Sequence, residues 1–115
     1  MTQTAMDAKA FAEMKDLMGE NFNNIISMCI QSLPAQLTEI ESAIKAQNAD
    51  TLFNISHKMK SSCGSIGAFG LAQKAEVIEL ISRDGSAEIS DKTLNDLRAA
   101  TQQVVSILNA ELEQL

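Results

Sequence analysis

The sequence predicts an all-α protein, an antiparallel up-down four-helix bundle with a short extra helix at its N-terminus. Ala, Leu, Ile, Met, Glu, Gln and Lys dominate it, and these residues lose little entropy in a helix. Only 3% of its 115 residues are aromatic, and five Gly and one Pro leave few turns for strands and hairpins. Apolar residues recur at helical spacings. With 45% hydrophobic residues, we expect residues 1–115 to form one helical-bundle domain with a single core.

The first two helices follow from their apolar spacing. We expect a short helix from Asp7 to about Met18, stopped by Gly19. Its apolar side chains, at three- and four-residue spacing, are Phe11, Met14, Leu17 and Met18. In the segment from 20 to about 47, the apolar residues keep the same helical spacing before and after Pro34. This segment is therefore either one long helix kinked near Pro34 or two nearly collinear helices.

The third and fourth helices are expected on either side of a glycine turn. The third covers about 50 to 64. Before it, Asn48 can adopt the left-handed conformation that ends the preceding helix, and Asn48 or Asp50 can cap the new helix. Residues 64–67, Gly-Ser-Ile-Gly, predict a tight turn. Because that turn is short, the helix from Ala68 to about Arg83 should run antiparallel to the third.

The last helix is expected after a cap at Ser90 or Asp91. Its apolar stripe has nearly heptad spacing and comprises Leu94, Leu97, Thr101, Val104, Leu108 and Leu115. A coiled-coil dimer could use such a stripe, but within a helical domain we expect it to close the bundle.

Charge and targeting signals restrict the partners. A net charge of −6 argues against binding to nucleic acid or anionic membranes. Cys29 and Cys63 lie among apolar residues without a Cys-x-x-Cys motif, so we expect reduced core thiols. The first six residues do not resemble a signal peptide, and no window reaches the ~18 apolar residues of a membrane span. We expect a cytoplasmic protein.

The single histidine, His57, is the strongest functional signal. At about 100° per residue, the apolar stripe of its helix passes through Met59 and lies well away from His57. The imidazole should therefore face water, with Lys60 and Ser61 one turn further on the same face. A neutral imidazole with a pKa of about 6.5 is a good nucleophile for a phosphoryl group. An ammonium three residues away could stabilise the charge of that group, and Lys60 suits this role better than Lys58.

Other chemistries lack their motifs. No second histidine, acid cluster or Cys-His spacing accompanies His57, so we expect no metal site. The glycine turn lacks the Gly-x-x-x-x-Gly-Lys-Ser/Thr pattern and a preceding strand, which argues against a nucleotide loop. The sequence shows neither a carboxylate pair nor a Ser-His-Asp set, so we do not expect an enzyme.

The histidine segment resembles the histidine-containing phosphotransfer (HPt) domains of two-component phosphorelays. The matching residues are His57, Lys60, Ser61, Gly64, Gly67, Ala68, Leu71, Glu79, Arg83 and Gly85. Many members have glycine where this chain has Ser61. The resemblance implies a phosphocarrier without an ATP-binding domain. It would accept a phosphoryl group on His57 from the phosphoaspartate of a hybrid sensor kinase receiver and pass it to a response-regulator receiver.

The resemblance also implies how partners bind. The receiver should supply Mg²⁺ and the acidic cluster, so this chain needs no cofactor of its own. An extra N-terminal helix often contributes exposed apolar residues to docking. The docking candidates are Phe11, Met14, Met18, Phe53, Lys58, Ser61, Gly64 and Phe69. Core packing is the alternative for the phenylalanines and methionines. We expect a monomer, because the His57 face must stay free for receivers.

Two other functions are compatible with the sequence. The chain could be the phosphoacceptor portion of a chemotaxis-type kinase, although its start at Met1 favours a freestanding protein. It could also be a helical adaptor without chemistry at His57, in which case signalling would tolerate His57→Gln.

Overall fold

The computed structural model describes residues 5–113, and nearly all of them are helical. The elements in chain order are α1 (Ala8–Met18), the 3-10 turn η1 (Gly19–Asn21), α2 (Phe22–Lys45), α3 (Ala49–Ser65), α4 (Phe69–Arg83) and α5 (Asp91–Glu113). The all-α prediction is confirmed. Residues 1–4, where a signal peptide would begin, and Leu115, the last member of the expected stripe, lie outside the described residues.

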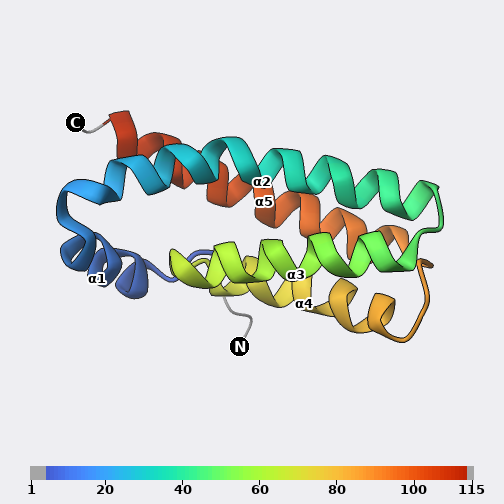
Figure 1. The fold of residues 1–115 in the computed structure, drawn as a ribbon. Helices are drawn as coiled ribbons and strands as arrows, with labels where there is room; N and C mark the ends of the chain where they lie inside the picture. The colour runs from blue at the N-terminus through green and yellow to red at the C-terminus, as the bar shows by residue number, and fades with distance from the viewer. Residues whose placement is uncertain (1–4, 114–115) are drawn as a thin grey trace.

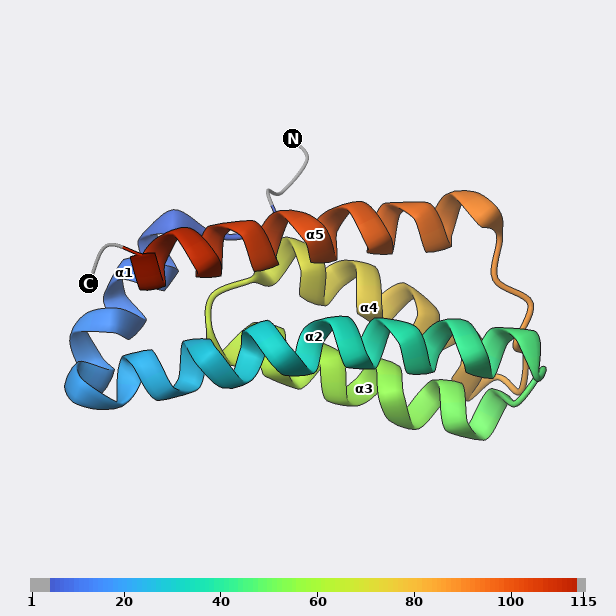
Figure 2. The ribbon, with the colours of Figure 1, turned by 90° about the horizontal axis from the view of Figure 1, so that it is seen from above.

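The four long helices form the predicted up-down bundle (Figures 1 and 2). Each helix packs against the next in the chain, and α5 closes the ring by packing against α2. The extra helix α1 lies at the end of the bundle where α3 meets α4. Among the described residues, no helix is both long enough and apolar enough to cross a membrane.

Helix α2 is continuous from Phe22 to Lys45, with Pro34 inside it, so the alternative of two separate helices is excluded. Pro34 is exposed and cannot donate a backbone hydrogen bond, which costs a helix about 3 kcal/mol where nothing compensates. Leu33 and Ile40 on the same helix are fully buried. Burial of this apolar stripe holds the helix together across the proline.

Polar side chains cap the helices near the expected positions. Asp7 accepts a hydrogen bond from the Ala10 amide at 2.9 Å and starts α1. Asn48 accepts one from the Thr51 amide at 3.1 Å and starts α3. The left-handed residue before α3 is Gln47 (φ 55°), not Asn48, which is extended as an N-cap must be.

The core is apolar and contains both cysteines. The α4 stripe of Leu71, Ala75 and Ile78 is fully buried against it. Cys29 and Cys63 are free thiols in this core, and burial, together with the nearby Cys29, raises the pKa of Cys63 to about 12. On α5 the buried stripe residues are Leu97, Thr101, Val104 and Leu108.

Backbone contacts fix the N-terminal segment against the turn between α3 and α4. The Asp7 amide donates to the Gly67 carbonyl at 2.9 Å, and the Leu71 amide donates to the Ala5 carbonyl at 3.3 Å. Gly67 has φ +79°, and a Cβ there would lie 3.0 Å from the Ala10 Cβ. This close approach brings α1 beside the C-terminal end of α3.

Candidate functional site

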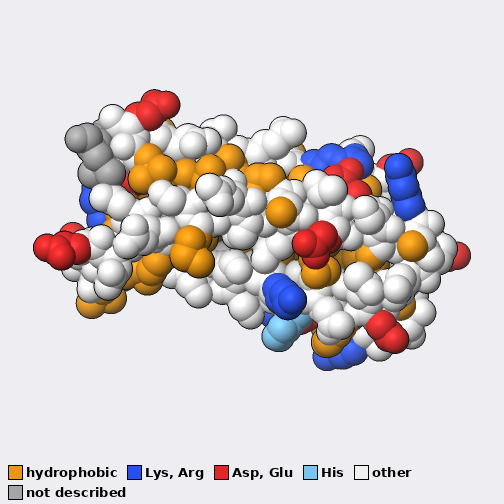
Figure 3. All heavy atoms as spheres, turned by 45° about the horizontal axis from the view of Figure 1, so that its top comes forward, with side chains coloured by type: hydrophobic (Ala, Val, Ile, Leu, Met, Phe, Trp, Pro, Cys, Tyr) orange, Lys and Arg blue, Asp and Glu red, His pale blue; other side chains and the backbone are white. Residues whose placement is uncertain are grey.

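His57 lies near the middle of α3 and points out of the bundle, as the helical spacing predicts. Its side chain is 55% exposed, whereas Ser56 and Met59 beside it in the sequence are fully buried. In Figure 3 the histidine side chain reaches the surface with a basic side chain next to it. A partner can therefore approach the imidazole without any rearrangement of the fold.

A carboxylate from the neighbouring helix α4 contacts the imidazole. Glu79 lies directly beside His57 and accepts a hydrogen bond from its Nδ1. The other Glu79 oxygen accepts one from the Lys60 ammonium. The Glu79 side chain is only 7% exposed, and that of Lys60 is 31% exposed. We call His57, Lys60 and Glu79 the His57 triad.

Sequence reasoning did not place Glu79 in the site. It gave this residue only as one of the positions shared with the HPt family, and it noted only that no acid cluster accompanies His57. A usable signal was present, because Glu79 sits between the buried Ile78 and Ser82 on the inner side of an amphipathic helix. A carboxylate almost never occupies such a position unless a cation or a donor faces it.

The two donors keep Glu79 ionised. Burial alone would raise the pKa of Glu79, but its hydrogen bonds to Lys60 and His57 and their charges outweigh burial and lower the pKa below its usual 4.5. At neutral pH the residue is a carboxylate, which can only accept hydrogen bonds. Nδ1 of His57 must then carry a proton.

This arrangement leaves the other ring nitrogen available. With the proton on Nδ1, a neutral imidazole has its lone pair on Nε2, at the opposite edge of the ring from Glu79. Because the His57 side chain is 55% exposed, Nε2 is the ring nitrogen available as a nucleophile, and Glu79 fixes its tautomer as carboxylates do for histidines in active sites. Lys60 places a positive charge on the same surface.

An aromatic ring also contacts the imidazole. Phe53 lies one turn before His57 on α3, and the two rings stack with centroids 6.1 Å apart and an interplanar angle of 18°. Phe53 is half-buried. The ring is therefore neither a simple core residue nor a freely exposed docking residue, the two interpretations that the sequence left open.

The docking candidates divide into buried and exposed groups. Phe11 and Met14 are buried, each 8% exposed, and Phe11 packs against the Phe22 ring. Their burial agrees with the alternative of core packing, because this face of α1 covers the end of the bundle core. Met18 is half-buried, and the exposed candidates are Lys58, Ser61, Gly64 and Phe69.

A shallow groove connects α1 with the end of the histidine helix. It measures about 310 Å³, and Leu17, Met18, Gly64 and Phe69 are among the residues that line it. Leu17 is 87% exposed and was not among the docking candidates. It is one of the regularly spaced apolar residues of α1, but it lies outside the side of the helix that faces the core.

No resident metal site is evident in the part of the chain that the structure describes. Within residues 5–113, no three His, Cys, Asp or Glu side chains come close enough together to hold a metal ion. The side chains of the His57 triad can supply a nucleophilic ring nitrogen, Nε2, and the positive charge of the Lys60 ammonium.

The chain is similar to known proteins in sequence and in fold. The sequence model of the family described as "Hpt domain" matches residues 24–114. The crystal structure of histidine-containing phosphotransfer protein B (HptB) from Pseudomonas aeruginosa PAO1 superposes with a TM-score of 0.89 at 17% identity, covering 96% of each chain. The HPT domain of a sensor hybrid histidine kinase from Shewanella superposes with a TM-score of 0.79, also at 17% identity and 96% coverage of each chain. No sequence among curated proteins matches the chain.

Proposed function

Because the chain belongs to the Hpt domain family, the phosphocarrier modules that work with receiver domains in two-component relays, we propose that His57 is its phosphoacceptor. The phosphoryl group would come from the phosphoaspartate of a hybrid sensor kinase receiver and pass on to the receiver of a response regulator. The observation that carries this proposal is the hydrogen bond from Nδ1 of His57 to the buried carboxylate of Glu79, which leaves Nε2 exposed as the nucleophile.

Acceptance of the group proceeds by in-line attack. The Nε2 lone pair forms the new N–P bond while the P–O bond to the aspartate breaks, and the aspartate carboxylate leaves with the bonding electron pair. The ring then carries a proton on Nδ1 and phosphorus on Nε2, so it is a cation. Its positive charge lies beside the Glu79 carboxylate, which stabilises it.

Delivery reverses these events. The aspartate carboxylate of a second receiver forms a P–O bond, the N–P bond breaks, and its electron pair returns to Nε2. Because Nδ1 keeps its proton, the leaving group is a neutral imidazole, which departs far more readily than an imidazolate. The same hydrogen bond to Glu79 therefore serves both directions of transfer.

Lys60 supplies the positive charge of the site. Its ammonium is held by Glu79 and is 31% exposed, so it lies at the surface that the phosphoryl group must reach. We assign it to stabilising the phosphoryl oxygens during transfer. The receiver would bring the Mg²⁺ that this chemistry needs, because the His57 triad offers a single carboxylate.

Docking would use the open surface around His57. Ser61 has a small side chain and Gly64 has none, and they lie one and two turns beyond His57, which gives a receiver active site room to approach. The groove lined by Leu17, Met18 and Phe69 offers apolar contact at the edge of this surface. We propose that the chain acts as a monomer, because a dimer formed through this face would cover His57.

The test is transfer of labelled phosphate from phosphorylated receiver domains of the source organism. Wild type and His57→Gln would be compared, because glutamine keeps the helix and cannot carry phosphate. We expect label on wild type alone, stable in alkali and lost in acid. Label on His57→Gln, or label that reaches wild type only from ATP and a kinase without a receiver, would contradict the proposed route.

A further inference from the structure

The imidazole of His57 is contacted on two sides within its own fold. Glu79 binds its edge at Nδ1, and the Phe53 ring lies nearly parallel to it in an offset stack with ring centroids 6.1 Å apart. This separation lies within the range of about 4.5–7 Å for favourable aromatic pairs. The two residues come from different helices, α4 and α3, so together they constrain the ring in two independent directions.

A hydrogen bond alone does not fix the direction of Nε2. The imidazole can rock about the line between Nδ1 and the Glu79 oxygen while the bond persists, because a single contact constrains one atom of the ring. A flat aromatic neighbour restricts this rocking motion, since tilting the imidazole would break the parallel stack. The interplanar angle of 18° is consistent with such a constraint.

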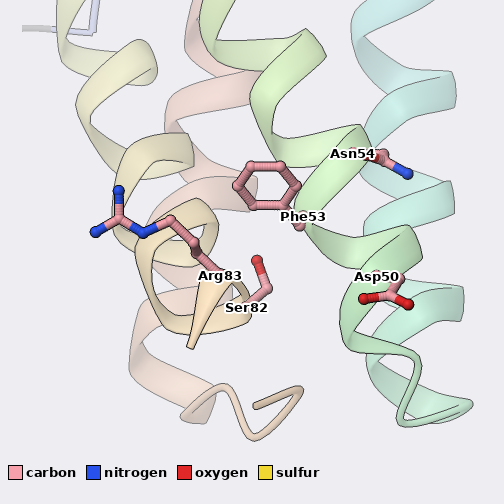
Figure 4. A pocket seen from close by; sticks show the side chains of 5 residues that line it. All are labelled: Asp50, Phe53, Asn54, Ser82 and Arg83. Atoms are coloured by element: carbon pink, nitrogen blue, oxygen red, sulfur yellow. The ribbon is translucent and has the colours of Figure 1, made fainter. Parts of the chain in front are cut away.

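Phe53 is placed to act on His57 more than on the core. It is half-buried and lines a pocket of about 410 Å³ together with Asp50, Asn54, Ser82 and Arg83. Figure 4 shows its ring projecting from α3 toward α4, among the residues that line this pocket. Because space remains beside the ring, its replacement should disturb the bundle much less than replacement of a fully buried residue.

We propose that Phe53 is a positioning residue for phosphotransfer, holding the His57 imidazole so that Nε2 points at the incoming phosphorus. This inference rests on the proposed function and adds a residue to it. Aromatic pairs of this kind are stabilising enough to change a rate about threefold to tenfold when the stack is lost. The loss should appear in the chemical step, because orientation affects the bound complex and not its formation.

The test compares two phosphoryl donors. A phosphorylated receiver must dock before it reacts, whereas phosphoramidate is small enough to reach His57 without docking. We expect Phe53→Ala to slow transfer from saturating receiver and labelling by phosphoramidate by a similar factor, about threefold to tenfold, with KM for the receiver unchanged. Phe53→Tyr keeps a stacked ring and should retain the wild-type rates, and Phe53→Leu should resemble Phe53→Ala. Met28→Ala, at a 68% exposed residue of α2, serves as the control.

A second readout does not depend on phosphotransfer. In NMR spectra of the unphosphorylated protein, the His57 ring should sample more orientations in Phe53→Ala and Phe53→Leu than in wild type, and thermal unfolding should confirm that both variants fold. An increase in KM alone, with unchanged phosphoramidate labelling, would overturn the proposal and make Phe53 a docking residue. Unchanged ring dynamics would also overturn it. If wild type took label from neither donor, the proposed function would fail, and the NMR comparison would still decide whether Phe53 positions the ring.

Discussion

The imidazole of His57 donates its Nδ1 proton to Glu79, a carboxylate on the neighbouring helix whose side chain is 7% exposed. A buried carboxylate is costly unless donors satisfy it, and here Lys60 supplies the second donor. The carboxylate thereby selects the ring tautomer and anchors the ammonium, and in the proposed function it stabilises the cation that phosphorylation of His57 would create. Substitutions in the His57 triad should therefore change both transfer and stability.

Replacing Glu79 by glutamine removes the charge while leaving a carbonyl oxygen that can accept the Nδ1 proton. We expect Glu79→Gln to keep the fold and to slow transfer to His57 about tenfold, because a hydrogen bond to a charged group exceeds a neutral one by about 1–1.5 kcal/mol. Rates at saturating receiver would measure this loss. A wild-type rate would show that the carboxylate charge has no part in the reaction.

Stability should depend on pH through the same residue. The folded pKa of Glu79 lies below its unfolded value of about 4.5, so the unfolded state binds more protons in this range and stability falls as the pH drops through the folded pKa. The free energy of unfolding of wild type should therefore decrease more steeply below about pH 4.5 than that of Glu79→Gln. Denaturant unfolding between pH 3 and pH 7 would show it, and parallel pH profiles would contradict the assignment.

The two lysines of the histidine helix should behave differently. Lys60 is bound to Glu79, so Lys60→Ala should lower the saturating transfer rate about tenfold to a hundredfold through loss of charge stabilisation. Lys58 is exposed on α3, and Lys58→Ala should change mainly KM for the receiver. The KM and kcat of both variants separate the two effects. Equal effects on kcat would mean that general surface charge, not the position of Lys60, matters.

Two glycines near the end of α3 provide a matched pair. A Cβ at Gly67 would lie 3.0 Å from both the Ala10 Cβ and the Phe11 backbone nitrogen, at φ +79°, whereas a Cβ at Gly64 would contact nothing within 4 Å. Gly67→Ala should destabilise the protein by about 1–3 kcal/mol and loosen α1. Gly64→Ala should be neutral or stabilising by up to about 1 kcal/mol, because Gly64 is helical. Equal unfolding free energies would refute the tight packing of α1 on the turn.

Local patterns were sufficient to predict the helices and the direction of His57. Caps such as Asn48 and the helical phase of the apolar residues act within one or two turns, so the sequence displays them directly. The continuity of α2 through Pro34 could not be decided in this way. It depends on burial of residues such as Leu33 against other helices, which only the assembled bundle provides.

Glu79, the hydrogen-bond partner of His57, was harder to predict for a related reason. Glu79 is 22 residues away, and only the register of α4 against α3 brings the two side chains together. The burial of Phe11 likewise depends on how α1 covers the bundle end, which the backbone contact between Asp7 and Gly67 fixes. An amphipathic pattern indicates that one face of a helix is apolar. It does not indicate which apolar residues of that helix become buried in the assembled bundle and which stay in solvent.

The position of phosphorus on the imidazole ring tests this mechanism better than any rate. The protein would be phosphorylated by a receiver and the phosphohistidine examined by NMR through its phosphorus-nitrogen couplings. Because Glu79 holds the proton on Nδ1, we expect phosphorus on Nε2 of His57. Phosphorus on Nδ1, or on any residue other than His57, would contradict the role assigned to Glu79 and the mechanism built on it.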